Sequence, residues 1–282
     1  MTSRFDRLIR KHDTQQKRRI IPGLTLAAAT IVAVGLFLAT IINTQAASPA
    51  EEASLAQACE GLSSGTLSIT QSRVSGVTGS GDNGCQVSVT ATPPSEGVSG
   101  CQVSFTPVRS GLDLSVEIVA IGTCAGVELE SSIEVGPTGS TGAGDAGATM
   151  SQSHKAVRSQ VTAWHYGSGA VPGIKLFWHY AKVAWSYDLN RIYNPSLTTG
   201  YWEGGCGWEL VSESRRTSST PTRYFGEHYT NWYADCGPLP DARAASRASV
   251  TAKPGGAYDC YGRATFRGGI AGFRYTHNCL VH

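Results

Sequence analysis

The sequence predicts an all-β protein, with two small disulfide-stabilised antiparallel β domains following one N-terminal hydrophobic helix. Three observations lead to this class: strand-like alternation over 59–136, short aromatic runs separated by glycines over 155–282, and eight cysteines that all follow the hydrophobic run. β-Branched and aromatic residues repeating at every second position are typical of half-buried strands. An even number of cysteines in an exported chain is typical of disulfides.

The N-terminus carries an export signal. Residues 1–19 form a basic leader, expected in the cytoplasm, and residues 20–43 form an uncharged, mostly apolar run. A run of this length can cross a hydrocarbon core about 30 Å thick, and the basic residues before it keep the leader inside. The run is either the h-region of a signal peptide cleaved after Ala46 or Ala47, or a retained transmembrane anchor. Both interpretations place the rest of the chain outside the cytoplasm.

The cysteines fall four and four into the two predicted domains. None is closer than 16 residues to the next, whereas a zinc site needs close pairs, so no metal or other cofactor is predicted. The expected disulfides are Cys85–Cys101, Cys59–Cys124, Cys206–Cys236 and Cys260–Cys279.

The first predicted domain, 59–136, is rich in Ser, Thr, Gly and Val, and its longest alternating segment is 112–118. Residues 84–90 and 100–106 repeat one pattern, Gly-Cys-Gln-Val-Ser, at an offset of 16 residues. A Pro-Pro-Ser-Glu-Gly turn signal lies between the two copies. We therefore expect them to be neighbouring strands of one small sheet.

A Gly-rich flexible linker is predicted at 137–154, where the charge also changes sign. Residues 1–50 carry a net charge of +5, residues 51–154 of −9 and residues 155–282 of +6. Opposite charge guides association more than it adds affinity. Two hypotheses stay open: two independently solvated domains, or an acidic pro-region that docks on the basic domain.

The basic domain, 155–282, holds all six tryptophans and all eleven tyrosines of the chain. This composition favours six to nine strands, with short helices as exceptions near 240–247 and 150–161. Aromatic residues among Gly and Arg are frequent at sugar-stacking and protein-contact surfaces, but they also fill small β cores. The candidate binding residues are Trp202, Trp208, Trp232 and Tyr201.

No catalytic residue is assigned. The chain has no H-E-x-x-H motif, and a set of Ser, His and Asp that no sequence motif brings together fixes no geometry. Glycoside hydrolysis needs a matched pair of carboxylates. The spacing selects no pair among Glu203, Glu209, Glu213 and Glu227.

One stretch carries a family resemblance. The run Lys-Leu-Phe-Trp-His-Tyr-Ala-Lys-Val-Ala-Trp-Ser-Tyr-Asp at 175–188, followed by Ile192, resembles exported actinobacterial proteins that share a W-x-Y-D run and Trp- and Cys-bearing strands. The resemblance covers about residues 160–280. It implies export and a β-rich C-terminal domain of unassigned biochemical role, and it transfers no catalytic residue.

We therefore expect an exported or membrane-anchored protein of a bacterial envelope that binds non-catalytically at the cell surface. Its expected partners are a cell-wall glycan or a surface protein, together with the membrane if 20–43 is uncleaved. Nucleic acid is not an expected partner, because of the location and the lack of any recognition motif. The alternatives are a secreted, bacteriocin-like antibacterial toxin with an acidic pro-region, and a cell-wall hydrolase.

Overall fold

The computed structural model describes residues 59, 61–69, 74–80, 84–111, 113–137, 153–165, 175–205, 207–235, 241–268 and 272–281. The elements found there are β1 (Gly65–Ile69), β2 (Val74–Ser80), β3 (Cys85–Thr92), β4 (Cys101–Ser110), β5 (Asp113–Ile121), β6 (Glu128–Val135), β7 (Ser153–His165), β8 (Lys175–Tyr187), β9 (Ile192–Glu203), β10 (Trp208–Thr220), β11 (Arg223–Ala234), β12 (Ala242–Ala252), the 3₁₀ helix η1 (Pro254–Gly256), β13 (Tyr258–Gly268) and β14 (Gly272–Val281).

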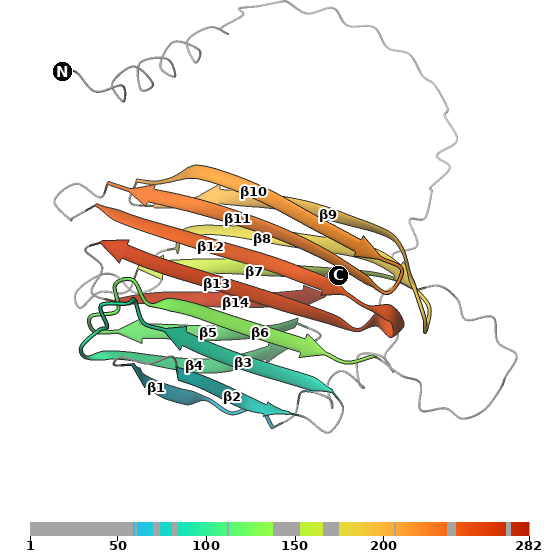
Figure 1. The fold of residues 1–282 in the computed structure, drawn as a ribbon, viewed down its shortest axis with the longest axis horizontal. Coiled ribbons are helices and arrows are strands. Elements are labelled where there is room, and N and C mark those ends of the chain that lie inside the picture. The colour runs from blue at the N-terminus through green and yellow to red at the C-terminus, as the bar shows by residue number, and fades with distance from the viewer. Residues whose placement is uncertain are drawn as a thin grey trace, which may run out of the picture. The chain divides into compact units, whose positions relative to one another are not determined.

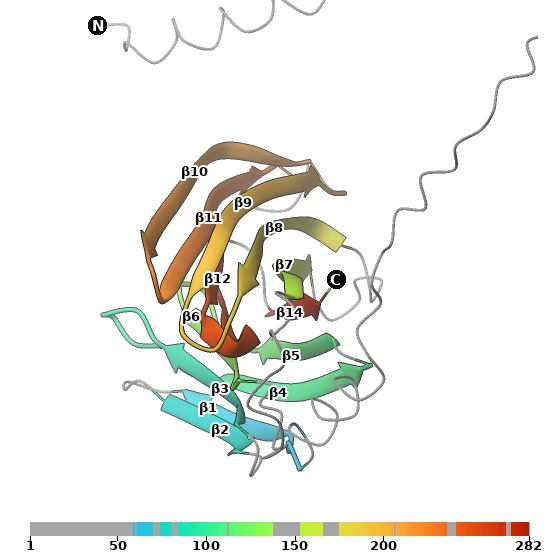
Figure 2. The ribbon, with the colours of Figure 1, turned by 90° about the vertical axis from the view of Figure 1, so that its right-hand side faces the viewer.

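The strands form two seven-stranded antiparallel sheets that pack face to face (Figure 1). Sheet A has the order β1-β4-β5-β14-β7-β8-β9, and sheet B the order β10-β11-β12-β13-β6-β3-β2. Figure 2 shows β1 and β2 at one end of this sandwich and β9 and β10 at the other. The predicted all-β, antiparallel and disulfide-linked class is confirmed, and the region expected to hold six to nine strands holds the eight strands from β7 to β14.

The two segments predicted as separate domains share both sheets. Strand β14 pairs with β5 in sheet A, and β13 pairs with β6 in sheet B. Residues 45–282 accordingly form one compact unit. The structure is therefore divided into two layers, and each layer contains strands from both halves of the sequence. The predicted separation of 59–136 from 155–282 into two domains is corrected accordingly.

The opposite charges of the two halves meet where these strands pair. Arg274 of β14 lies 2.7 Å from Glu117 of β5, and Arg263 of β13 forms an ion pair with Glu128 of β6. The hydroxyl of Tyr261 also donates a hydrogen bond of 2.8 Å to Glu130. The charge segregation thus serves cross-strand pairing within one fold, rather than two independent domains.

The space between the sheets changes character along the sandwich. Near β3 to β6 it is filled by aliphatic side chains such as Val87, Val116 and Ile133, which are fully buried. Near β8, β11 and β13 it is filled by rings such as Phe177 and Phe266, whose centroids lie 6.1 Å apart. The aromatic composition of the second half therefore builds the ring-filled part of a continuous core.

One predicted disulfide is confirmed and two are wrong. Cys260–Cys279 joins β13 to β14, so it links the two sheets. The other observed bonds are Cys59–Cys85 and Cys101–Cys124, with Cα atoms 5.2 and 5.0 Å apart. They replace the predicted Cys85–Cys101 and Cys59–Cys124. Every cysteine within the described ranges is disulfide-bonded, and Cys206 and Cys236 lie outside those ranges.

The wrong pairings follow from the internal repeat. Its two copies became β3 and β4, which belong to different sheets because residues 93–100 carry the chain from one layer to the other. The two cysteines are therefore not brought together: Cys85 bonds to Cys59, which precedes β1, and Cys101 bonds to Cys124, in the segment between β5 and β6.

Both predicted helices are wrong. Residues 242–252 form β12 and residues 153–165 form β7. The basic leader, the run 20–43 and the cleavage positions lie outside the described residues, as do 138–152 of the predicted linker.

Candidate functional site

Two of the four aromatic residues predicted to bind a partner lie in the core. Trp208 and Trp232 expose only 3% and 1% of their surface. Phe177 stacks on Trp232 with ring centroids 4.5 Å apart, and its centroid lies 5.1 Å from that of Trp208. A ligand could reach either indole only by opening the sandwich, so the core interpretation holds for these two residues.

Trp202 and Tyr201 are exposed, at 42% and 44%, but on opposite sides of β9. Tyr201 is in register with the inward-facing His179 and lies edge-on to Trp232, at a centroid distance of 6.1 Å. Trp202 is in register with Trp178 on the outer side of sheet A. The structure therefore separates the predicted cluster, and of its four members only Trp202 lies on an outer face.

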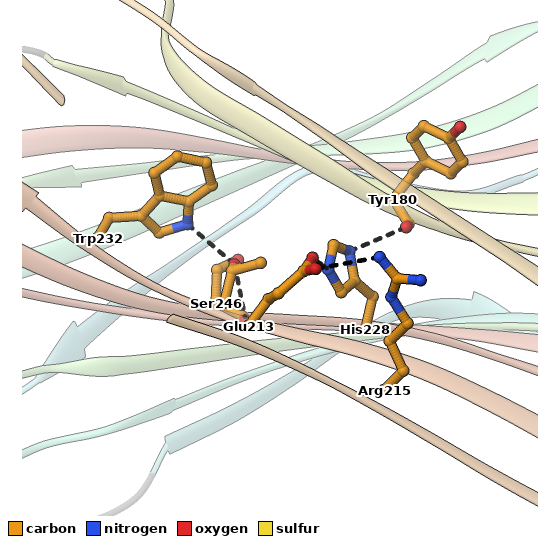
Figure 3. A network of polar contacts seen from close by, with 7 residues as sticks. Tyr180, Glu213, Arg215, His228, Trp232 and Ser246 are labelled. Carbon is orange, nitrogen blue, oxygen red and sulfur yellow. Dashed lines mark hydrogen bonds and ion pairs between the residues drawn. The ribbon is translucent and has the colours of Figure 1, made fainter. Parts of the chain in front are cut away.

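A polar network lies between the sheets (Figure 3). His228 of β11 is fully buried. Its Nδ1 lies 3.2 Å from the carbonyl oxygen of Tyr180, and its Nε2 lies 2.8 Å from Glu213 of β10. The side chain of Arg215 contacts the same carboxylate at 3.0 Å. Three strands from both sheets thus meet at one imidazole ring.

The partners of His228 fix where its protons are. A carbonyl oxygen only accepts, so Nδ1 carries a hydrogen, and Nε2 faces a carboxylate. Burial opposes the ionisation of Glu213, but the hydrogen bond from His228 and the charge of Arg215 outweigh it and lower the pKa of the carboxyl. His228 therefore bridges a backbone carbonyl and an ionised carboxylate, and this contact links β10 to the sheet interior.

A second buried histidine, His179, is neutral. Its Nε2 lies 2.7 Å from Ser246 Oγ, and that hydroxyl donates to the carbonyl of Arg263 at 3.3 Å. Nε2 is therefore the donor, and Nδ1 has no hydrogen-bond partner in the described structure. Desolvation, followed by the nearby charge of His228, moves the pKa of His179 well below its ordinary value.

This Ser–His pair does not resemble an active nucleophile. Ser246 is 1% exposed, and its proton is already donated to a backbone carbonyl. A triad also needs an acid that orients the base. Glu213 is bonded to His228, whose ring lies edge-on to that of His179 at 5.2 Å rather than donating to it. The network connects the two sheets and presents no attacking group to solvent.

The carboxylates considered for glycoside hydrolysis each have a different partner or none. Glu203 accepts a hydrogen bond from the backbone of Leu210 at 3.1 Å, and Glu227 pairs with Arg247 at 3.3 Å. Glu213 is bonded to His228, whereas Glu209 is exposed. No geometry here places two of them around a substrate.

Glu213→Gln is expected to destabilise the protein by about 1–3 kcal/mol, because the buried His228 loses its ionised hydrogen-bond partner. Urea denaturation at pH 7 would measure the change. Glu209→Gln, an exposed glutamate on the same strand, is the matched control and should be near neutral. Equal stability of both variants would contradict the role of Glu213 as the ionised partner of the buried His228.

The outer side of β7, β8 and β9 carries a different constellation, which we call the aromatic–cationic face: Arg158, Trp178, Tyr180, Lys182 and Trp202. The rings of Trp178 and Tyr180 are nearly parallel, with centroids 6.0 Å apart. The Arg158 guanidinium carbon lies 4.0 Å from the Tyr180 ring centroid and 5.8 Å from that of Trp178. These are cation–π distances.

Local sequence explains this face. In β8, Phe177, His179 and Ala181 point inward, so Trp178, Tyr180 and Lys182 alternate outward. Gly200 of β9 lies in register with Tyr180, and a Cβ there would come within 2.7 Å of the phenol ring. The glycine therefore leaves room for the ring to lie across the neighbouring strand.

The charge of this face is one-sided. The sequences of β7, β8 and β9 contain a single acidic residue, Glu203, which shares the inner side with Phe177. Arg158 and Lys182 are in register with each other, and neither has a carboxylate partner among the described residues. Burial lowers the pKa of Arg158, and its buried Nε has no hydrogen-bond partner in the described structure.

Four of these residues were missed in the sequence: Arg158, Trp178, Tyr180 and Lys182. The signal was present in the alternation of 177–182, where one side of the strand is apolar or small and the other is aromatic and basic. The link from Arg158 to this strand depends on the pairing of β7 with β8, which the sequence does not show.

Within the described ranges, no cluster of His, Cys, Asp or Glu is placed to hold a metal ion, and no helix has the length and hydropathy needed to cross a membrane. Comparison with known proteins gives no match: no family model, no curated protein and no solved structure is significantly similar to this chain.

Proposed function

We propose that this is an exported bacterial envelope protein that binds a polysaccharide at the cell surface without catalysis, through the aromatic–cationic face. The disulfides are compatible with a compartment outside the cytoplasm. The same proposal includes export of the chain, and its anchoring through 20–43 if that segment is retained. The proposal also includes a relation of 160–280 to the actinobacterial exported proteins that this region resembles.

The observation that carries the proposal is the placement of three rings on the solvent side of one sheet. Trp178 and Trp202 are cross-strand neighbours, and Tyr180 continues the row along β8. Large rings on an outer face leave a flat apolar surface with polar edges. The CH-bearing face of a sugar ring can stack on such a surface while its hydroxyls stay solvated.

The alternatives gain no support from the geometry. A toxin held behind a removable acidic segment needs a basic domain that is complete without it, whereas β13 and β14 pair with β6 and β5. A hydrolase needs an accessible reacting group, whereas Ser246 is buried and Glu213 is bonded to His228.

Trp202→Ala is expected to weaken binding to purified peptidoglycan sacculi about tenfold, because alanine removes the most exposed of the three stacking rings. Co-sedimentation over a range of sacculus concentrations would measure it. The matched control is Leu189→Ala, which removes an apolar side chain that is 61% exposed in the turn after β8. Unchanged binding by folded Trp202→Ala would contradict the proposed face.

A further inference from the structure

We infer that the aromatic–cationic face selects an anionic polysaccharide, with Arg158 and Lys182 contacting its carboxylate or phosphate groups. This inference rests on the proposed function and names the class of ligand for the same face. The rings supply contact with the sugar, and the two cations discriminate charged from neutral chains.

The first step is the contrast between these cations and others on the sandwich. On the outer side of sheet B, Arg247 pairs with Glu227 and Arg263 with Glu128. Elsewhere on sheet A, Arg274 pairs with Glu117. In the part of the chain that the structure describes, Arg158 and Lys182 face each other across β7 and β8 without a carboxylate.

The second step is the cost of this arrangement. Like charges directly opposite each other on neighbouring strands are destabilising. Arg158 is also partly withdrawn from water, because its guanidinium lies against two rings and its Nε is buried without a partner. An anion bound between the two cations would relieve the repulsion, and partial desolvation would strengthen the contact.

The third step is the choice of polymer. The cations lie directly beside the rings on one side of the sheet: Lys182, in register with Arg158, is two residues from Tyr180, which is two residues from Trp178. A ligand that fits must present apolar faces and negative groups in close succession. A polysaccharide of charged sugars does so along its length, whereas a lipid surface presents its charges in one layer and its apolar part in another.

The network behind the face supports its rigidity. The carbonyl of Tyr180 accepts the hydrogen bond from His228, whose other nitrogen is bonded to Glu213. The strand that carries the outward rings is thereby fixed to β10 and β11 from the inner side. A pre-formed row of side chains loses little conformational entropy on binding.

The test is binding of the full exported chain to polygalacturonate and to its methyl-esterified form, which keep the same backbone and differ in charge. We expect the charged polymer to bind at least tenfold more tightly, and raising the salt from about 50 to 500 mM to remove most of the difference. Arg158→Gln and Lys182→Gln should each remove most of the preference. Arg267→Gln, an exposed arginine on the outer side of sheet B, should keep it.

The outcomes separate the two proposals. If both polymers bind equally and Trp202→Ala weakens both, the polysaccharide function stands and the anionic selection is overturned. If neither these polymers nor peptidoglycan bind, both the polysaccharide-binding function and the anionic selection are overturned. Binding to teichoic acid, which carries phosphates, is compared with binding to polygalacturonate, which carries carboxylates. The comparison shows which of the two groups the face recognises. Binding to vesicles containing anionic lipid, with no binding to any polymer, would overturn the inference in favour of a membrane surface.

Discussion

Residues 59–137 and 153–282, expressed as separate chains, are each expected to remain unfolded or to aggregate. Separation removes the pairing of β14 with β5 and of β13 with β6, each of which joins eight residue pairs. It also exposes core side chains such as Ile118 and Phe273. Unpaired strand edges beside exposed apolar surface favour association of like chains over folding.

Far-UV circular dichroism and thermal unfolding of the two chains, made under oxidising conditions, would measure this. The intact chain should unfold cooperatively, whereas neither half alone should do so. The two halves refolded together should regain the transition, because the strand pairs do not require a covalent connection at 138–152. Cooperative unfolding of an isolated half would show that it folds independently and would contradict the shared-sheet architecture.

Local strand character could be read from the sequence, but strand pairing could not. Alternation at 112–118 predicted a strand where β5 lies, because side chains of a half-buried strand alternate whatever their partners. The repeated pattern at 84–90 and 100–106 has the same periodicity whether its copies pair in one sheet or face each other across the core. Only the path of residues 93–100 determines whether the two copies lie in one sheet or in two. The composition of this turn does not encode which layer the chain enters.

The predicted helix at 240–247 was wrong for a related reason. Alanine favours helices in isolation, but tertiary context overrides such preferences. In β12 the inward Ala244 and Ala248 are nearly or fully buried, and the strand is paired on both sides, with β11 and β13. Ala244 lies in register with Trp232 on one side and Phe266 on the other, so its small side chain leaves space for Phe177 of sheet A, whose ring stacks on both.

The candidate site shows the limit of composition as a guide. Trp202 and Trp232 both lie among Gly, Tyr and Arg in the sequence, yet one is on the surface and the other is a core residue. What separates them is the side of the strand each occupies, which is a matter of register. The alternation of 177–182 indicated that register for β8, whereas Arg158 joined the face only through strand pairing.

Acidification from pH 7 to about pH 4 is expected to lower the free energy of unfolding by several kcal/mol, mainly through two buried histidines. Desolvation lowers the pKa of His277 to about 3, and that of His179 lies well below the usual value. In the unfolded chain both titrate near 6.5. Below that value the unfolded state binds more protons than the native state, so stability falls by up to about 1.4 kcal/mol per pH unit for each histidine.

The surroundings of His277 show why it stays neutral. Its Nδ1 lies 2.8 Å from Ser131 Oγ of β6, in the sheet opposite, and the ring is fully buried. Gly262 of β13 makes the space, since a Cβ there would lie 2.9 Å from the imidazole Cγ. A hydroxyl can satisfy a neutral ring nitrogen but gives a buried imidazolium no countercharge, so protonation favours unfolding.

His277→Asn tests this assignment, because the amide can still reach Ser131 but does not titrate. Urea midpoints at pH 7.5, 6 and 5 would give the pH dependence of stability for both proteins. The variant is expected to be less stable at pH 7.5, since the smaller side chain leaves a cavity, yet to lose less stability on acidification than the wild type. The difference in slope is the decisive quantity: packing loss alone shifts all three midpoints together, so an unchanged slope would mean that His277 contributes nothing to the acid sensitivity.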